Sequence, residues 1–191
     1  VAWPASIERW ARSDRSTSRL TSQFHARMAH KPSPSSPPTS ASACPDEMWM
    51  RIALECARQG GSKGEVPVGA VVVREGRVIG KGNNRTIRDT DPTAHAEVVA
   101  LRAAAQSQGD WRLSGATLYV TLEPCSMCAG AIVLSRIARV VFAAHDPKAG
   151  MGGSLDNILQ DKRLNHYCEV DSGILSSESS SLLKSFFRQR R

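Results

Sequence analysis

Two short segments of the sequence place potential metal ligands at the starts of two predicted helices. His95-Ala96-Glu97 opens the first helix, and Pro124-Cys125-Ser126-Met127-Cys128 opens the second after a gap of 26 residues (98–123). Cys125 and Cys128 lie three positions apart, about 300° around a helix, so their sulfurs should project from nearly the same face. One metal ion can bind both sulfurs and the His95 imidazole only if the fold brings the two helix starts together.

These three side chains form a ligand set that suits a catalytic zinc ion. A helix N-terminus carries a partial positive charge, which favours the thiolate form that Cys125 and Cys128 need as ligands. Two cysteines and one histidine leave the fourth position of zinc open for water, as in catalytic rather than structural sites. Glu97 lies two positions beyond His95, about 200° around a helix. We therefore expect that Glu97 does not coordinate the ion and instead moves protons to and from the water and the substrate.

Each segment taken alone has an ordinary interpretation. A lone Cys-x-x-Cys is also typical of a redox pair, and a lone His-x-Glu is more often a surface pair. Their combination, with the proline and with both segments at helix starts, favours the zinc site. Cys44, Cys56 and Cys168 lack partners at ligand spacing and are interpreted as tail, core and strand residues. The odd total of five cysteines also disfavours a disulfide framework.

The first 45 residues differ in composition from the rest of the chain. The stretch from Lys31 to Ala43 is rich in proline and serine and has almost no apolar surface to offset the entropy cost of ordering it. Residues 1–45 are therefore predicted to form a disordered N-terminal extension, and residues 46–191 a single domain. The basic, serine-rich extension suits an organelle transit peptide or a leader translated from an upstream start.

Charge and hydropathy say little about partners. The net charge of +7 falls to +3 in residues 46–191, which hold 19 of the 25 basic and 16 of the 18 acidic residues. Bulk charge is thus weak evidence for a nucleic-acid partner. No apolar run approaches the roughly 20 residues of a membrane-spanning helix, so we expect no membrane association and a cytoplasmic location.

Helical and strand patterns alternate beyond residue 46 and predict an α/β fold arranged as a three-layer α/β/α sandwich. Asp46 is expected to cap the first helix, which Gly60 and Gly61 end. A β-branched run at 69–73 and its return at 77–80 predict a hairpin with its turn at 74–76. The remaining elements are expected to be helices at 94–106, 126–136 and 179–188 and strands at 116–122, 139–144 and 167–170.

Longer strings around the ligand residues resemble the cytidine deaminase-like superfamily and, within it, the bacterial tRNA adenosine deaminases (the TadA family). The zinc signature alone specifies only the superfamily. The narrower resemblance runs from about Trp49 to Arg191. It is carried by Glu65-Val66-Pro67-Val68-Gly69-Ala70, by the runs 91–97 and 116–130, by Gly153-Ser154-Leu155, by Leu164-Asn165-His166 and by Phe186-Phe187-Arg188.

This resemblance implies a five-stranded mixed sheet, a homodimer and one zinc ion per subunit. It also implies hydrolytic deamination of adenosine to inosine at the wobble position (34) of a tRNA anticodon. Residues 46–191 would then be a zinc-dependent deaminase domain that binds zinc through His95, Cys125 and Cys128, with Glu97 as the proton shuttle. The base is expected to contact Asn84, Val68, Ala96, Leu122 and Pro124, and the RNA is expected to contact Asp146, Lys148, Phe187, Arg188 and Arg190.

Alternatives remain open from the residues themselves. Asn84 beside Gly82 also suits a turn, Asp146-Pro147-Lys148 is often an ordinary turn, and the last helix suits core packing with a solvated basic end. The protein could instead deaminate a free nucleobase or nucleotide such as cytosine, cytidine or guanine. It could also be a non-catalytic zinc module that binds RNA, for which a fourth protein ligand on the metal would be the sign.

Overall fold

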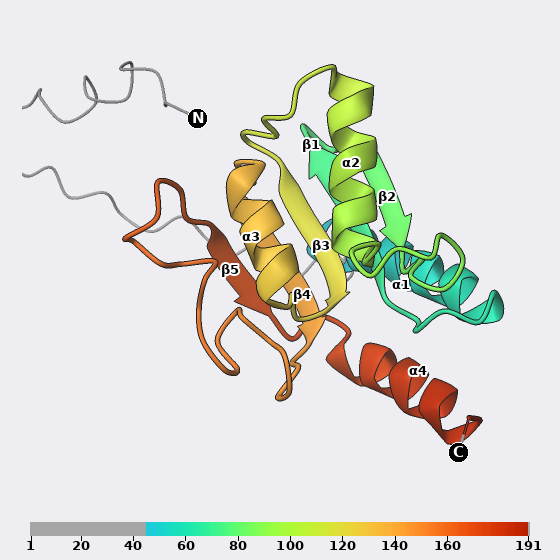
Figure 1. Cartoon of the computed structure of the whole chain (residues 1–191). Coiled ribbons are helices and arrows are strands. Elements are labelled where there is room, and N and C mark those ends of the chain that lie inside the picture. Colours follow the sequence, from blue (N-terminus) through green and yellow to red (C-terminus); the bar gives the residue numbers. More distant parts are fainter. Residues whose placement is uncertain (1–44, 191) are drawn as a thin grey trace, which may run out of the picture. The chain divides into compact units, whose positions relative to one another are not determined.

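A five-stranded mixed sheet forms the middle layer of the domain in the computed structural model, which describes residues 45–190 (Figure 1). The strand order is β2-β1-β3-β4-β5, in which β1 is antiparallel to β2 and β3, while β3, β4 and β5 run parallel. The predicted disordered extension lies outside the described residues except for Pro45, as does Arg191. The elements are α1 (Pro45–Ser62), β1 (Gly69–Arg74), β2 (Arg77–Asn83), α2 (Ala96–Gln108), β3 (Thr117–Leu122), α3 (Ser126–Leu134), β4 (Arg139–Ala144), β5 (Glu169–Ser172) and α4 (Ser176–Arg188).

Helices cover both faces of this sheet (Figure 1). On one face, Ala100 of α2 and Ile132 of α3 share a buried cluster with Val120 of β3. On the other face, Met50 of α1 joins a second cluster with Val71 of β1, and α4 contacts α1, β3 and β4. The predicted α/β/α sandwich with a five-stranded mixed sheet is confirmed. Between residues 45 and 190 we find no helix with the length and apolar character needed to cross a bilayer.

Helix α2 approaches β2 closely because small residues face each other between them. Ala96, Ala100 and Ala104 recur every four positions along α2 and pack over Gly80 and Gly82 of β2. A Cβ on Gly82 would overlap the backbone of Ala96 and Ala100. This contact fixes where α2 begins relative to the end of β2.

Several element boundaries differ from the sequence prediction. Strand β1 continues to Arg74, and the hairpin turns through Glu75 and Gly76 alone, whose φ angles are 51° and 68°. Two successive positive φ angles are what a two-residue type I′ turn requires. The last strand begins at Glu169, two residues after the predicted start at Tyr167.

Asp46 joins α1 to the sheet and is not the cap residue that we expected. Helix α1 already begins at Pro45, and the Asp46 carboxylate accepts hydrogen bonds from the Tyr119 hydroxyl at 2.6 Å and the Arg139 guanidinium at 2.7 and 2.9 Å. The bonds from Arg139 hold the pKa of Asp46 below its ordinary value, against the effect of burial. This network lies at the amino end of β4, whereas the predicted site residues gather at the carboxyl ends of β3 and β4.

Candidate active site

Two helix starts meet beyond the carboxyl end of β3. His95 is the N-cap residue of α2 and Cys125 is the N-cap residue of α3, and both have extended backbones, with φ/ψ of −73°/155° and −74°/176°. Cys125 therefore precedes the helix and only Cys128 lies in its first turn. The prediction that both sulfurs project from one helical face is corrected in this detail, although both still reach the His95 ring.

The three predicted metal ligands converge on one point. Nδ1 of His95 lies 3.7 Å from Sγ of Cys125 and 3.6 Å from Sγ of Cys128, and all three ligand atoms lie within 4.8 Å of one another. Tetrahedral zinc, with Zn–S of about 2.3 Å and Zn–N of about 2.05 Å, would hold nitrogen and sulfur about 3.6 Å apart. Donor types and spacing therefore fit zinc. Within residues 45–190, no fourth His, Cys, Asp or Glu joins the group.

The two thiols differ in how readily they ionise. Hydrogen bonds from Cys128 and His95 lower the pKa of the Cys125 thiol to about 4. The hydrogen bond with Cys125, together with burial, raises the pKa of Cys128. Cys125 is thus ready to act as a thiolate ligand, whereas Cys128 loses its proton when a cation binds.

Glu97 lies in the first turn of α2 and lines a cavity next to the ligand group. Only 4% of its surface is exposed, and this burial raises the pKa of its carboxyl to about 7. A group with such a pKa can take up and release protons near neutral pH. Because Glu97 is outside the three-residue ligand group, its placement suits proton transfer.

Asn84 follows β2 and braces the start of α2. Its Oδ1 accepts a hydrogen bond from the N–H of Ala96 at 2.9 Å, and the buried residue lines the cavity. Because the amide oxygen is already engaged, its NH2 group is the part left to donate to a ligand. Ala96 was predicted to contact the base, but it lies outside the cavity lining and its N–H is bound to Asn84.

The cavity beside the ligand group has a volume of about 710 Å³, within the usual range for small-molecule sites. It brings together Val68, Asn84 and Leu122 from the predicted base-contacting set. Pro124 lies outside the lining, where its carbonyl accepts the N–H of Met151. The rest of the wall includes the predicted Asp146, Lys148 and Phe187, and also Val66, Glu123, His145, Pro147, Ala149, Leu183 and Lys184.

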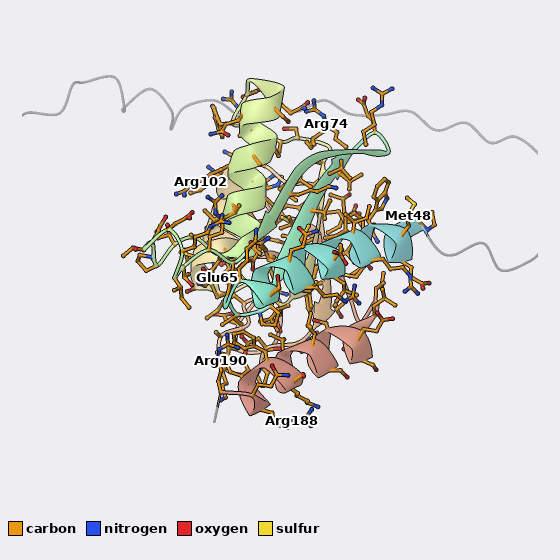
Figure 2. All side chains as sticks on the ribbon, turned by 90° about the vertical axis from the view of Figure 1, so that its right-hand side faces the viewer. Met48, Glu65, Arg74, Arg102, Arg188 and Arg190 are labelled. Carbon is orange, nitrogen blue, oxygen red and sulfur yellow. The ribbon has the colours of Figure 1, made fainter. Side chains whose placement is uncertain are left out.

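The two arginines predicted to contact RNA lie outside the cavity, at the end of α4 (Figure 2). Arg188 is exposed. The Arg190 guanidinium lies 3.7 Å from the ring centroid of Phe186 and donates a hydrogen bond to the carbonyl of Gly64. Arg190 therefore holds the end of α4 against the loop between α1 and β1.

Glu65 is a buried carboxylate beside the site that sequence reasoning did not single out. It accepts hydrogen bonds from the N–H groups of Arg88 at 2.8 Å and Ile87 at 3.1 Å and from the hydroxyl of Thr86 at 3.1 Å. Burial acts to raise the pKa of Glu65, but these hydrogen bonds bring it below its ordinary value. Glu65 thereby holds the loop that joins Asn84 to His95.

Glu123 is a second buried carboxylate that was missed, and it follows β3 directly. Burial acts to raise its pKa, but hydrogen bonds from Ser154 and from backbone N–H groups of the loop after β4 lower it. An acidic residue between apolar Leu122 and Pro124 is the sequence signal that could have identified it. The same kind of signal is weaker for Glu65, which lies in a polar turn.

Fold and site together define a deaminase. The family model described as MafB19-like deaminase matches residues 44–191. The tRNA-specific adenosine deaminase of Bacillus subtilis (strain 168) is 50% identical to this chain over 146 residues, which cover 76% of the chain and 91% of the relative. The chain belongs to the family of tRNA-specific adenosine deaminases.

Solved structures agree with this assignment. A structure from studies of A-to-I editing by tRNA:A34 deaminases at the wobble position is 46% identical, with a TM-score of 0.69, and the match covers 71% of this chain and 99% of that one. A guanine deaminase from Nitrosomonas europaea shares the fold at a lower identity of 26%, with a TM-score of 0.65, over 73% of this chain and 83% of that one.

Proposed function

We propose that the protein hydrolyses adenosine to inosine at the wobble position (34) of a tRNA anticodon, with one zinc ion per subunit. The observation that carries this proposal is that Glu97 lines the same cavity as the metal ligands His95 and Cys125, in a chain 50% identical to a tRNA-specific adenosine deaminase. Val68 and Leu122 offer apolar walls for a flat purine in that cavity.

The chain's own residues supply the ligands and the proton transfers. His95, Cys125 and Cys128 would hold zinc, which supplies an activated water when bound. Glu97 accepts a proton from this water and passes it to a ring nitrogen of adenine, which makes the amine-bearing carbon more open to attack. The same carboxyl then takes the second proton from the hydroxyl now bonded to that carbon and donates it to the departing amine, so that the carbon is left with a C=O group, water is consumed and ammonia leaves. Asn84 donates a hydrogen bond that orients the base.

A catalytic site is favoured over a structural zinc module. A structural site fills all four metal positions with protein ligands, but the part of the chain described here brings only three together. A structural site would also have no use for a buried carboxylate, Glu97, on an adjoining cavity.

An RNA substrate is favoured over a free base by the cavity wall. Lys148 and Lys184 contribute positive charge to it, and Phe187 adds an aromatic residue that is 52% exposed. Positive side chains neutralise phosphates, and exposed aromatic rings stack on bases of single-stranded loops. Deamination of a free purine, suggested by the more distant guanine deaminase, is therefore the second candidate.

The test offers purified protein an anticodon stem-loop RNA with adenosine at position 34 and, in separate reactions, free adenosine, cytidine and guanine. We expect inosine in the RNA at position 34 and no product from the free compounds. A hairpin in which only adenosine 34 is replaced by guanosine is the matched control. Product from a free compound with none in the RNA would replace the proposal with a free-nucleobase deaminase.

Association into a homodimer, a cytoplasmic location and a domain boundary near residue 46 remain predictions. Light scattering of the purified protein checks the first, and we expect a molar mass twice the 20.7 kDa of one chain. Microscopy of a tagged protein checks the second. Limited proteolysis checks the third, because cleavage should stop close to the start of α1.

A further inference from the structure

Glu123 occupies an unusual place for a carboxylate. Its side chain is fully buried, with 0% exposed, and it lies between Leu122, the last residue of β3, and Pro124. No cationic side chain of Lys or Arg pairs with it among residues 45–190; its one ion-pair neighbour there is the ring of His145, whose Nδ1 lies 3.4 Å from Oε2. A buried carboxylate without a strong cationic partner has to be satisfied by hydrogen-bond donors.

Those donors all come from the loop at residues 145–154, which follows β4. Oε2 accepts the N–H of Asp146 at 2.9 Å, and Oε1 accepts the N–H groups of Gly152 at 2.9 Å and Ser154 at 3.0 Å. The Ser154 hydroxyl donates to Oε2 as well. These four bonds use the acceptor sites that two carboxylate oxygens offer.

The loop also packs tightly around this carboxylate. A Cβ on Gly150 would overlap the carboxyl group of Glu123, and one on Gly152 would press against the ring of Phe142 and lie in ordinary contact with the Cγ and Oε1 of Glu123. The chain therefore wraps around Glu123 at both ends of the loop and in its middle. Removal of the carboxylate would leave three backbone N–H groups without their acceptor.

The same loop forms one wall of the cavity. His145, Asp146, Pro147, Lys148 and Ala149 all line it, together with residues of α4. By contrast, the metal ligands and Glu97 come from the starts of α2 and α3. The position of this wall thus depends on Glu123, while the metal ligands and Glu97 are held by α2 and α3.

We propose that Glu123 is a positioning residue that holds loop 145–154 as the RNA-facing wall of the cavity. The proposal rests on the function proposed above. It assigns to Glu123 an effect on substrate binding through Asp146 and Lys148, and none on the proton transfers.

Glu123→Gln is the direct test, because glutamine has nearly the same size but one acceptor oxygen, and its NH2 group would face N–H donors. With the A34 hairpin as substrate, we expect KM to rise about 10-fold or more, because the loss of one to two hydrogen bonds would let the loop leave its binding position. We expect kcat within about 2-fold of the parent, and an unchanged zinc content per chain. Asp46→Asn is the matched control, since it removes a carboxylate at the far end of β4 and should lower the Tm while leaving KM and kcat unchanged.

Ser154→Ala keeps the test decisive if Glu123→Gln does not fold. It removes one of the four hydrogen bonds and should raise KM in the same direction by a smaller factor. An unchanged KM in the variants, or a fall in kcat or zinc content at constant KM, would overturn the proposal. Amide hydrogen exchange gives a readout without substrate: exchange in Glu123→Gln should accelerate at Asp146, Gly152 and Ser154. If the parent protein makes no inosine in the hairpin, the proposed function fails, while unchanged exchange at these amides refutes the role of Glu123 itself.

Discussion

Nδ1 of His95 lies 3.6 Å from Sγ of Cys128, although 33 positions separate the two residues in the chain. The two residues come together because α3 begins shortly after β3 ends, and because α2 packs closely on the glycines of β2. The separation matches that of two ligands on one tetrahedral zinc ion, about 3.6 Å. The ligand geometry is therefore a property of the folded chain.

Cys128→Ser should remove most of the metal. A hydroxyl is a poor replacement for a thiolate on zinc, so we expect affinity to fall by more than the 10–100-fold typical of indirect partners. Elemental analysis after dialysis measures this. Cys168→Ser is the control, because Cys168 is buried elsewhere and its thiol donates only to the carbonyl of Ile137. Equal metal content in the two variants would contradict the ligand assignment.

Asn84→Asp and Asn84→Ala should separate two roles of this side chain. Aspartate keeps an acceptor for the N–H of Ala96 but loses the donor toward the cavity, whereas alanine loses both. We expect Asn84→Asp to keep its zinc and lose about 10–100-fold in kcat/KM, because an acceptor of the base left unsatisfied in the buried site costs about 1–3 kcal/mol. Asn84→Ala should in addition lower the Tm. Parent-like kcat/KM for Asn84→Asp would remove Asn84 from the substrate site.

Gly82→Ala should destabilise the protein, because the new Cβ would overlap the backbone of Ala96 and Ala100. Overpacking of this kind costs about 1–3 kcal/mol. Because α2 would have to move away from β2 to make room for the new Cβ, the start of α2 would be displaced. Zinc affinity should therefore fall together with the free energy of unfolding. Lys81→Ala, at an exposed position on the same strand, should change stability by no more than about 0.5 kcal/mol. Denaturant unfolding of both variants provides the comparison.

Asp46 should contribute to stability in a pH-dependent way. Its pKa is lowered in the folded protein by the hydrogen bonds from Arg139. A depressed pKa stabilises the fold above the unfolded value of about 3.9 and stops doing so as the pH falls through the folded value. The Tm difference between the parent and Asp46→Asn should therefore be full at pH 6–7 and shrink below about pH 4. A difference that is constant down to pH 2 would show that Asp46 acts without its charge.

Much of the fold could be predicted because its elements are long or strongly patterned. The β-branched run of β1, the alanine-rich α2 and the apolar β4 each carry a clear periodicity. Strand β5 is short and mostly exposed, with only Val170 partly buried between Glu169 and Asp171, so its pattern is weak and its start was misplaced by two residues. Asp46 was misassigned as a cap because its partners, Tyr119 and Arg139, are distant in sequence.

The candidate site divides in the same way. The metal ligands and Glu97 could be identified because zinc chemistry restricts both residue types and spacing. Glu65 and Glu123 were missed because their function is to accept backbone N–H groups, and backbone donors leave no trace in the sequence. The position of Glu123 between apolar Leu122 and Pro124 is the one sequence signal that marks either of them. Arg190 was predicted to contact RNA from its charge together with the family resemblance, whereas its stacking on Phe186 depends on where α4 ends.

In the proposed function, Glu97 moves the protons of a metal-dependent deamination of RNA. The most direct measurement is single-turnover inosine formation in the A34 hairpin by Glu97→Gln, with zinc content determined on the same sample. We expect about one zinc per chain and a rate at least about 10²-fold below that of the parent, because general acid–base catalysis typically contributes a factor of this size. A variant that retains zinc and makes inosine within a few-fold of the parental rate would contradict this role of Glu97.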